Sequence, residues 1–235
     1  PIIDGQGKVR ATRAIFLALI VMSPVVVLAN YYKNPPHYPF SVSRLPQGIV
    51  TFLDKIPARG TVLNHPNLGG YLQWTLHPKY KILMDMQVPF VFKDEDLHAG
   101  VLAFSHPEVF SKLIDRYEPT FIMPYLVNRE VRRSLERYPQ YKLVNFDHLA
   151  ALYMNADHYP DLAREWELKH IDPFELLDKS SSLIVGAENQ QGFVEGLSRI
   201  LKSYPECLMG NQLMAMVHLN NGEFNKALSR AEVII

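Results

Sequence analysis

Polar side chains in this 235-residue chain gather where two short apolar runs end. Thr61–Leu63 is followed at once by Asn64 and His65, and Lys81–Met84 ends at Asp85. If both runs are parallel strands, these side chains meet at the carboxyl ends, where open α/β sheets present polar groups to ligands. The Asp85 carboxylate could then hold a sugar hydroxyl or a divalent cation, with Asn64 and His65 facing the same crevice. The alternative is structural, with Asp85 capping a turn and His65 packed locally.

A glycine pair opens the helix predicted between these two strands. Gly69 and Gly70 lie in its first turn and Tyr71 follows them. Helix N-termini bind anions well, so a phosphate could approach the backbone at this point. The sequence is neither GxGxxG nor a P-loop, and a glycine here is equally explained by close packing of the helix on a strand. The predicted ligand-binding residues are therefore Asn64, His65, Gly69, Gly70, Tyr71 and Asp85.

Other site classes have weaker support in the sequence. The nine histidines never fall in HxH or HExxH, and Cys207 is the only cysteine, so we predict no metal site and no disulfide within the chain. No nucleophile-elbow setting surrounds the serines, so we predict no catalytic residue. The chain has 24 basic and 24 acidic residues, and this balance argues against a nucleic-acid partner.

The elements that must position the crevice follow an alternating pattern. Apolar runs of strand length alternate with segments of 10–13 residues that have helical periodicity. Two further apolar runs, the last of the domain, lie on either side of Asp147-His148. Such alternation predicts a parallel sheet, and the closing pair predicts an antiparallel hairpin at its edge. We therefore expect a small three-layer α/β domain with a mixed sheet over residues 59–155. The predicted strands are Thr61–Leu63, Lys81–Met84, Thr120–Met123, Tyr141–Phe146 and Leu149–Met154.

A membrane segment is predicted before this domain. Ala14–Tyr32 contains no charged residue and is about as long as a hydrocarbon core is thick when helical. Lys8, Arg10 and Arg13 precede it, which predicts a cytoplasmic flank at residues 1–13 and an extracytoplasmic location for residues 33–235, periplasmic in a Gram-negative cell. Residues 33–58 form a linker and a short helix. A secretory signal peptide or a buried core helix are the alternatives.

The end of the chain is wholly helical in pattern. After a connector at residues 156–173, residues 174–235 resemble tetratricopeptide repeats, which pair two helices with small residues at their crossing. Ala215, Gly222, Ala227 and Ala231 match the repeat, whereas Phe193 replaces a small residue in the preceding one. The resemblance implies a protein partner and an array that continues beyond Ile235. An unrelated helical hairpin is the alternative.

The central domain resembles a known family. The segments VLNHPNLGGYLQWTLHPKYKILMD, FSKLIDRYEPTFIMPY and YPQYKLVNFDHLAALYMN are similar to the extracytoplasmic domain that follows the last membrane helix of GT-C superfamily glycosyltransferases. The chain departs from the related oligosaccharyltransferases at Asn64–Asn67, which stands in place of their Trp-Trp-Asp-Tyr-Gly motif. It also has Met86-Gln87 where many relatives have Gly-Arg.

The resemblance implies an accessory domain of a membrane enzyme that uses a polyprenyl-phosphate sugar. In that family the catalytic acid lies in a loop near the start of the membrane portion, so we expect it outside this chain. We also expect no cofactor here, while the parent protein could use a divalent cation. The rival hypothesis is a non-enzymatic envelope scaffold that binds protein partners through its helical repeats.

Overall fold

The computed structural model describes residues 5–33, 44–86, 93–176 and 190–234. It divides the chain into two compact units, Pro1–Val42 and Ser43–Ile235. Each unit is described by itself.

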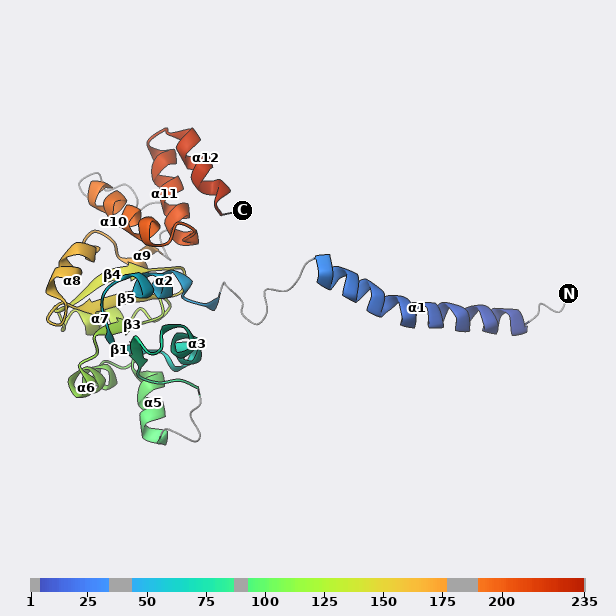
Figure 1. Ribbon diagram of the computed structural model, residues 1–235, viewed down its shortest axis with the longest axis horizontal. Coiled ribbons are helices and arrows are strands. Elements are labelled where there is room, and N and C mark those ends of the chain that lie inside the picture. Colours follow the sequence, from blue (N-terminus) through green and yellow to red (C-terminus); the bar gives the residue numbers. More distant parts are fainter. Residues whose placement is uncertain (1–4, 34–43, 87–92, 177–189, 235) are drawn as a thin grey trace. The chain divides into compact units, whose positions relative to one another are not determined.

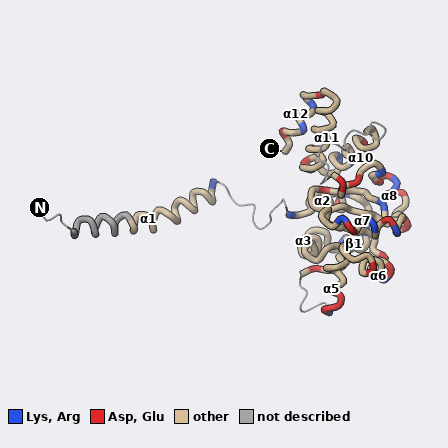
Figure 2. Tube along the Cα trace, turned by 180° about the vertical axis from the view of Figure 1, so that it is seen from behind, with Lys and Arg blue, Asp and Glu red and all other residues tan. Residues whose placement is uncertain are grey.

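The first unit is one helix, α1 (Gly5–Lys33). Its segment Phe16–Lys33 has a mean hydropathy of 1.6, and none of that segment is buried. Figure 2 shows no charged residue in the segment Phe16–Lys33 before the lysine at its end. The chain therefore has, as predicted, an N-terminal helix long and apolar enough to cross a membrane. Its exposed side chains give no support to the buried core helix.

The second unit contains a five-stranded mixed sheet in the order β2-β1-β3-β5-β4 (Figure 1). β1 pairs in parallel with both β2 and β3, while β5 pairs antiparallel with β3 and β4. The predicted α/β class, the mixed sheet and the antiparallel closing hairpin are thus confirmed. The strands are β1 (Gly60–Asn64), β2 (Tyr80–Ile82), β3 (Phe121–Met123), β4 (Tyr141–Phe146) and β5 (Ala151–Asn155).

Helices cover both faces of the sheet. Successive strand residues point to opposite faces, so neighbours in one strand are buried in different cores. Val62 packs in one core and its neighbour Leu63 in the other. The first core is closed by α2 (Gln47–Lys55), α3 (Pro66–Leu76) and α8 (Pro160–Trp166). The opposite core is closed mainly by α6 (Pro107–Tyr117), α7 (Val131–Leu135), α9 (Pro173–Leu176), α10 (Gln190–Ser203) and α11 (Leu208–Asn220). The helix α5 (Asp94–Leu102) precedes α6.

The second strand is shorter than predicted. β2 ends at Ile82, whereas the apolar pattern extended it to Met84. The reason is the side chain of Asn64, whose Oδ1 accepts from the Leu83 N–H at 3.1 Å and whose Nδ2 donates to the Met84 carbonyl at 2.8 Å. The Leu83 N–H also keeps a backbone bond to the Val62 carbonyl at 2.9 Å, so the amide side chain takes the place of a backbone partner only at the Met84 carbonyl. Asp85 therefore lies three residues beyond the strand and not at its tip.

The C-terminal helices continue the core of the sheet. Leu197 of α10 and Leu213 of α11 are buried in the same cluster as Leu63 and Ile122 of the sheet. Gly222, with φ of +73°, turns the chain between α11 and α12 (Phe224–Glu232). This left-handed conformation favours glycine, so the turn predicted at this position is confirmed.

The side chain of Lys79 caps the C-terminus of α2. The Lys79 ammonium donates to the carbonyls of Leu53, Asp54 and Ile56 at 2.8, 2.6 and 2.7 Å. These are among the carbonyls that a helix end leaves without a partner, and a cation also suits the negative end of the helix dipole. The contact ties α2 to the start of β2.

Candidate functional site

The predicted site residues lie at the carboxyl ends of β1 and β3, next to the turn between β4 and β5. Asn64 is the last residue of β1, and His65 is the N-cap of α3. Tyr125 forms an isolated bridge with Ala150, which brings the segment after β3 to the β4–β5 turn. The fold thus gathers groups from four segments at one end of the sheet.

Asn64 is fully buried and its amide is used within the protein. Besides the bonds to Leu83 and Met84, its Nδ2 donates to the His65 carbonyl at 2.9 Å. Both amide N–H groups and the carbonyl therefore have protein partners. The structure places Asn64 as a clip between β1 and the segment after β2, not as a group presented to a ligand.

His65 is half-buried and also has a local role. Its Nδ1 accepts from the backbone N–H of Asn67 at 3.2 Å, which satisfies one of the free donors at the start of α3. The ring lies 5.1 Å from that of Tyr125, centroid to centroid. Burial lowers the pKa of the imidazole, so it is neutral over a wider pH range. With Nδ1 accepting, we assign the proton to Nε2, which leaves that atom as a donor.

The two glycines differ in their surroundings. A Cβ on Gly69 would lie 2.2 Å from the Met84 carbonyl oxygen and 2.4 Å from the Asp85 Cα. A Cβ on Gly70 would meet nothing within 4 Å. Gly69 is therefore required by the close approach of α3 to the segment after β2, while Gly70 is not. Asp85 is half-exposed, and its backbone forms part of this contact.

A buried carboxyl group, Asp147, lies at this end of the sheet in the β4–β5 turn. It is 1% exposed. Its Oδ1 accepts from the N–H groups of Leu149 and Ala150 at 2.9 and 3.0 Å, and its Oδ2 accepts from Ile49 near the start of α2 at 3.4 Å. Burial raises the pKa of this carboxyl, and the three N–H donors oppose that effect.

The charge of the Asp147 carboxylate affects the pKa of two nearby tyrosines. Burial and the Asp147 carboxylate together raise the pKa of Tyr71, and both also raise the pKa of Tyr204, with burial the larger cause. The Tyr204 hydroxyl donates to Gln47 Oε1 at 3.3 Å. Tyr71 is therefore the predicted site residue that the fold brings near the buried acid, whereas Asn64 and Gly69 serve the packing of β1 and α3.

Asp147 is not among the predicted site residues, although it lies in the predicted hairpin turn. An aspartate between two strands is an ordinary turn former, because its side chain bonds to backbone N–H groups two and three residues on. Its burial depends on α2, which is about 100 residues earlier in the chain. No local pattern reports that contact.

Metal ligands do not converge in the part of the chain that the structure describes. No group of three or more His, Cys, Asp or Glu side chains there is placed to hold an ion. Cys207 is buried, and burial raises the pKa of its thiol to about 11, which makes it a poor nucleophile. Comparisons with protein-family models, with curated proteins and with solved structures found no match to this chain.

The arrangement can therefore do limited chemistry. Its buried acid is satisfied by backbone donors, and its buried amide is satisfied on both sides. What remains at the surface of this end are the His65 imidazole and the rings of Tyr71 and Tyr125, which are suited to contact and hydrogen bonding. The geometry favours a binding or structural role over proton transfer.

Replacement of Gly69 by alanine is expected to destabilise the protein by about 2 kcal/mol, because the new methyl group overlaps backbone atoms that cannot move away easily. Gly70→Ala is the matched control and should be neutral or stabilising by up to about 1 kcal/mol, since helix propensity improves. Chemical denaturation of the chain in nanodiscs, followed by circular dichroism, measures both. Equal stabilities would show that Gly69 is not a packing position.

Asp147→Asn is expected to change how stability depends on pH. The folded pKa of Asp147 is raised, so between its unfolded value of 3.8 and the folded value the native state binds more protons, and stability falls as pH rises through that window. One group contributes at most about 1.4 kcal/mol per pH unit. Denaturation at a series of pH values should show a smaller fall for Asp147→Asn than for the wild type. Asp161→Asn, at an exposed carboxyl, should keep the wild-type profile, and an unchanged profile in Asp147→Asn would contradict the shift.

Proposed function

We propose that this chain is a membrane-anchored, extracytoplasmic accessory domain that binds a protein partner through its C-terminal helices. One observation carries the proposal. The last helix, α12, buries Ala227 against α11 but leaves Phe224 69% exposed and Leu228 60% exposed. These two residues are four apart and lie on one face of the helix.

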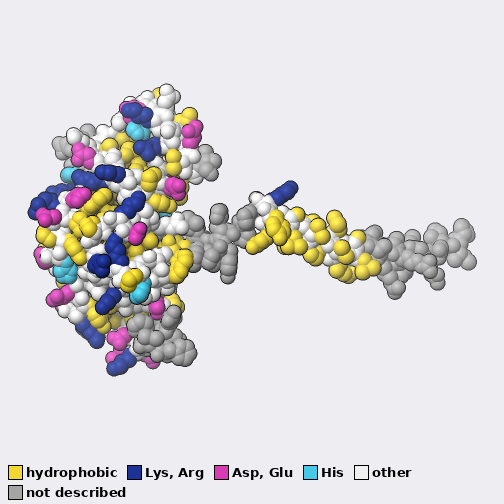
Figure 3. Space-filling view, viewed as in Figure 1, with side chains coloured by type: hydrophobic (Ala, Val, Ile, Leu, Met, Phe, Trp, Pro, Cys, Tyr) yellow, Lys and Arg dark blue, Asp and Glu magenta, His cyan; other side chains and the backbone are white. Residues whose placement is uncertain are grey.

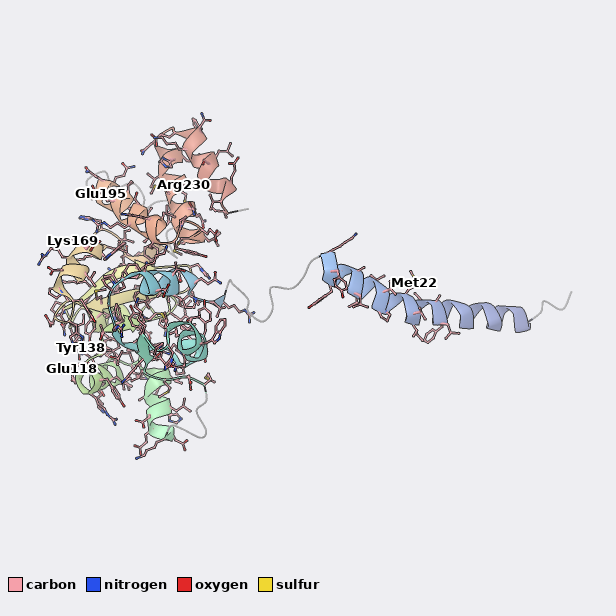
Figure 4. All side chains as sticks on the ribbon, in the orientation of Figure 1. Met22, Glu118, Tyr138, Lys169, Glu195 and Arg230 are labelled. Atoms are coloured by element: carbon pink, nitrogen blue, oxygen red, sulfur yellow. The ribbon has the colours of Figure 1, made fainter. Side chains whose placement is uncertain are left out.

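The packing of α11 and α12 supports a repeat-like hairpin. Ala215 and Ala227 are both buried, as expected for small residues where two helices cross. Arg230, labelled in Figure 4, donates to Asn211 Oδ1 at 3.3 Å, and His218 lies 2.6 Å from a Glu223 carboxylate oxygen. These contacts join α12 to α11 and support a tetratricopeptide-like unit, which remains part of the proposal.

The exposed face calls for a helical partner. In stacked helical repeats, the outer face of one helix packs against the next helix of the array. Phe224 and Leu228 would fill the same role here, with an amphipathic helix of a second protein as the occupant. A further repeat of the same chain would give the same contact but only within the molecule, so the experiment must separate the two.

The membrane helix suits the same function. Lys8, Arg10 and Arg13 precede the apolar part of α1 and favour a cytoplasmic start, which would place the α/β unit and its helices outside the cytoplasm. An anchored domain that holds a partner near the bilayer needs no active site of its own. This agrees with the use of the Asn64 amide and the Asp147 carboxylate at this end of the sheet in bonds within the protein.

Photo-crosslinking from position 228 is expected to give one discrete adduct with a second protein in native membranes. Leu228 would be replaced by p-benzoylphenylalanine, with the same replacement at the exposed neighbour Ser229 as the control. The adduct should be lost when Phe224→Asp is added, since a charge on the apolar face removes most of the contact area. Equal adducts at both positions, or adducts only within the chain, would contradict a partner protein at this face.

A second candidate is the accessory domain of a GT-C-like glycosyltransferase that uses a lipid-linked sugar. The observation that favours it is the surface left at the carboxyl end of the sheet, where His65, Tyr71 and Tyr125 offer a donor and aromatic rings. Groups of this kind can contact an acceptor or the sugar of a carrier lipid without taking part in the chemistry.

Turnover of the full-length protein with polyprenyl-phosphate sugars tests this candidate. His65→Ala should lower kcat/KM about tenfold, mainly through KM, if the surface only positions a substrate. His98→Ala on α5 is the control and should have little effect. Activity that is equal in the two variants would remove the carboxyl-end surface from the function, and absence of transfer with all donors would favour the scaffold.

A further inference from the structure

A concave site lies on the face formed by α2, α8 and α10. Its volume is about 360 Å³, within the range of small-molecule sites. The C-terminal parts of α2 and α10 form two of its sides, and α8 forms the third. The site therefore lies between the sheet domain and the C-terminal helices.

The lining is largely apolar. Phe52 and Ile56 of the α2 segment are buried beneath it, and Leu162 and Trp166 of α8 are half-exposed beside them. The rings of Phe52 and Trp166 are 5.1 Å apart and nearly perpendicular, at 77°. An edge-to-face pair of this kind is rigid and leaves the outer surface of the indole available. This surface suits an acyl chain or another apolar body.

Positive charge is concentrated at the mouth. Lys55 and Lys202 both line the site. The Lys55 ammonium donates to the Ser203 carbonyl at the end of α10, a neutral acceptor that leaves its charge in place. Lys202 is exposed, and within the described residues no carboxylate lies within ion-pair distance of it. On the face seen in Figure 3, hydrophobic side chains lie between Lys and Arg side chains over this part of the fold.

Other charges around the mouth are accounted for. Glu165 is the one acidic side chain of the lining and lies on α8, opposite the lysines. Arg199 donates to the backbone carbonyls of Glu165 and Glu167, both at 3.1 Å. Lys79 is committed to the end of α2. Among these charged side chains, Lys202 is the cation available to a ligand, and Lys55 supplies a second positive charge behind it.

We propose that this site binds a small amphipathic carboxylate, with its apolar body against Leu162 and Trp166 and its carboxylate at Lys202. The two lysines select an anionic head, and the volume of about 360 Å³ limits the body to one short chain or ring. A bound ligand of this type would touch α2, α8 and α10 together. It would therefore stabilise the attachment of the C-terminal helices to the sheet by mass action.

Octanoate is a suitable probe because it is soluble and carries both features. The full chain in nanodiscs, with Trp74→Phe so that Trp166 is the remaining tryptophan, would be titrated by fluorescence and by calorimetry. We expect a saturable signal, and 1-octanol, which lacks the charge, should bind at least about fivefold more weakly. Lys202→Gln should weaken octanoate binding about 2- to 5-fold, the upper part of the range expected for loss of one exposed charge pair.

Two further variants make the test decisive. Lys112→Gln removes an exposed lysine from α6 and should change the dissociation constant less than about twofold. Leu162→Trp should fill the site and abolish saturable binding. The proposal is overturned if octanol binds as tightly as octanoate, if Lys202→Gln matches Lys112→Gln, or if the signal rises without saturation as partition into the bilayer would produce. Should Leu162→Trp fail to fold, the comparison of the two lysine variants still decides.

Discussion

The fold of the second unit depends on one buried carboxylate at the start of α2. Asp147 bonds to the N–H groups of its own turn and to Ile49 of α2, and Pro46, the N-cap of that helix, offers no side-chain cap. A negative charge there suits the positive end of the helix dipole, which offsets part of the cost of burial. Gly48 makes the approach possible, since a Cβ there would lie 3.2 Å from both Asp147 and Tyr204. The turn of the sheet, α2 and the α10–α11 junction therefore meet at one point.

This constraint commits two buried polar groups at the carboxyl end of the sheet to the packing of the fold. Its strongest polar groups, Asp147 and Asn64, are satisfied by backbone groups and hold segments together. Function is then more easily carried by surfaces that the fold leaves apolar, such as the face of α12 and the site between α2, α8 and α10. Both surfaces involve the C-terminal helices, of which α10 and α11 share the core of the sheet and so cannot move independently of it without exposing that core.

Local patterns predicted much of this architecture. Continuous apolar runs of strand length located the strands, because both faces of the sheet are buried and neighbouring strand residues enter opposite cores. Proline and glycine marked the ends of elements, and Gly222 turned the chain where expected. The second strand was overextended because the Asn64 side chain, and not a backbone group of β1, bonds to the Met84 carbonyl, and a count of apolar residues cannot detect a side chain that imitates backbone pairing. The six predicted site residues do lie near one another, yet their roles differ, since Gly69 and Asn64 are packing and clip positions whereas Gly70 is unconstrained.

The sequence alone determined the α/β class, the approximate positions of the five strands and the apolar N-terminal helix, because those properties follow from spacing and composition within about 20 residues. It also indicated that Asn64, His65 and Asp85 share one end of the sheet, since parallel strands bring their ends together. Only the tertiary structure decided which of these groups are consumed inside the fold. The burial of Asp147 by α2, the clash that excludes a side chain at Gly69, and the site shared by α2, α8 and α10 all depend on contacts between residues about 15 to 150 positions apart. Such contacts are set by how the layers pack, and no local pattern encodes them.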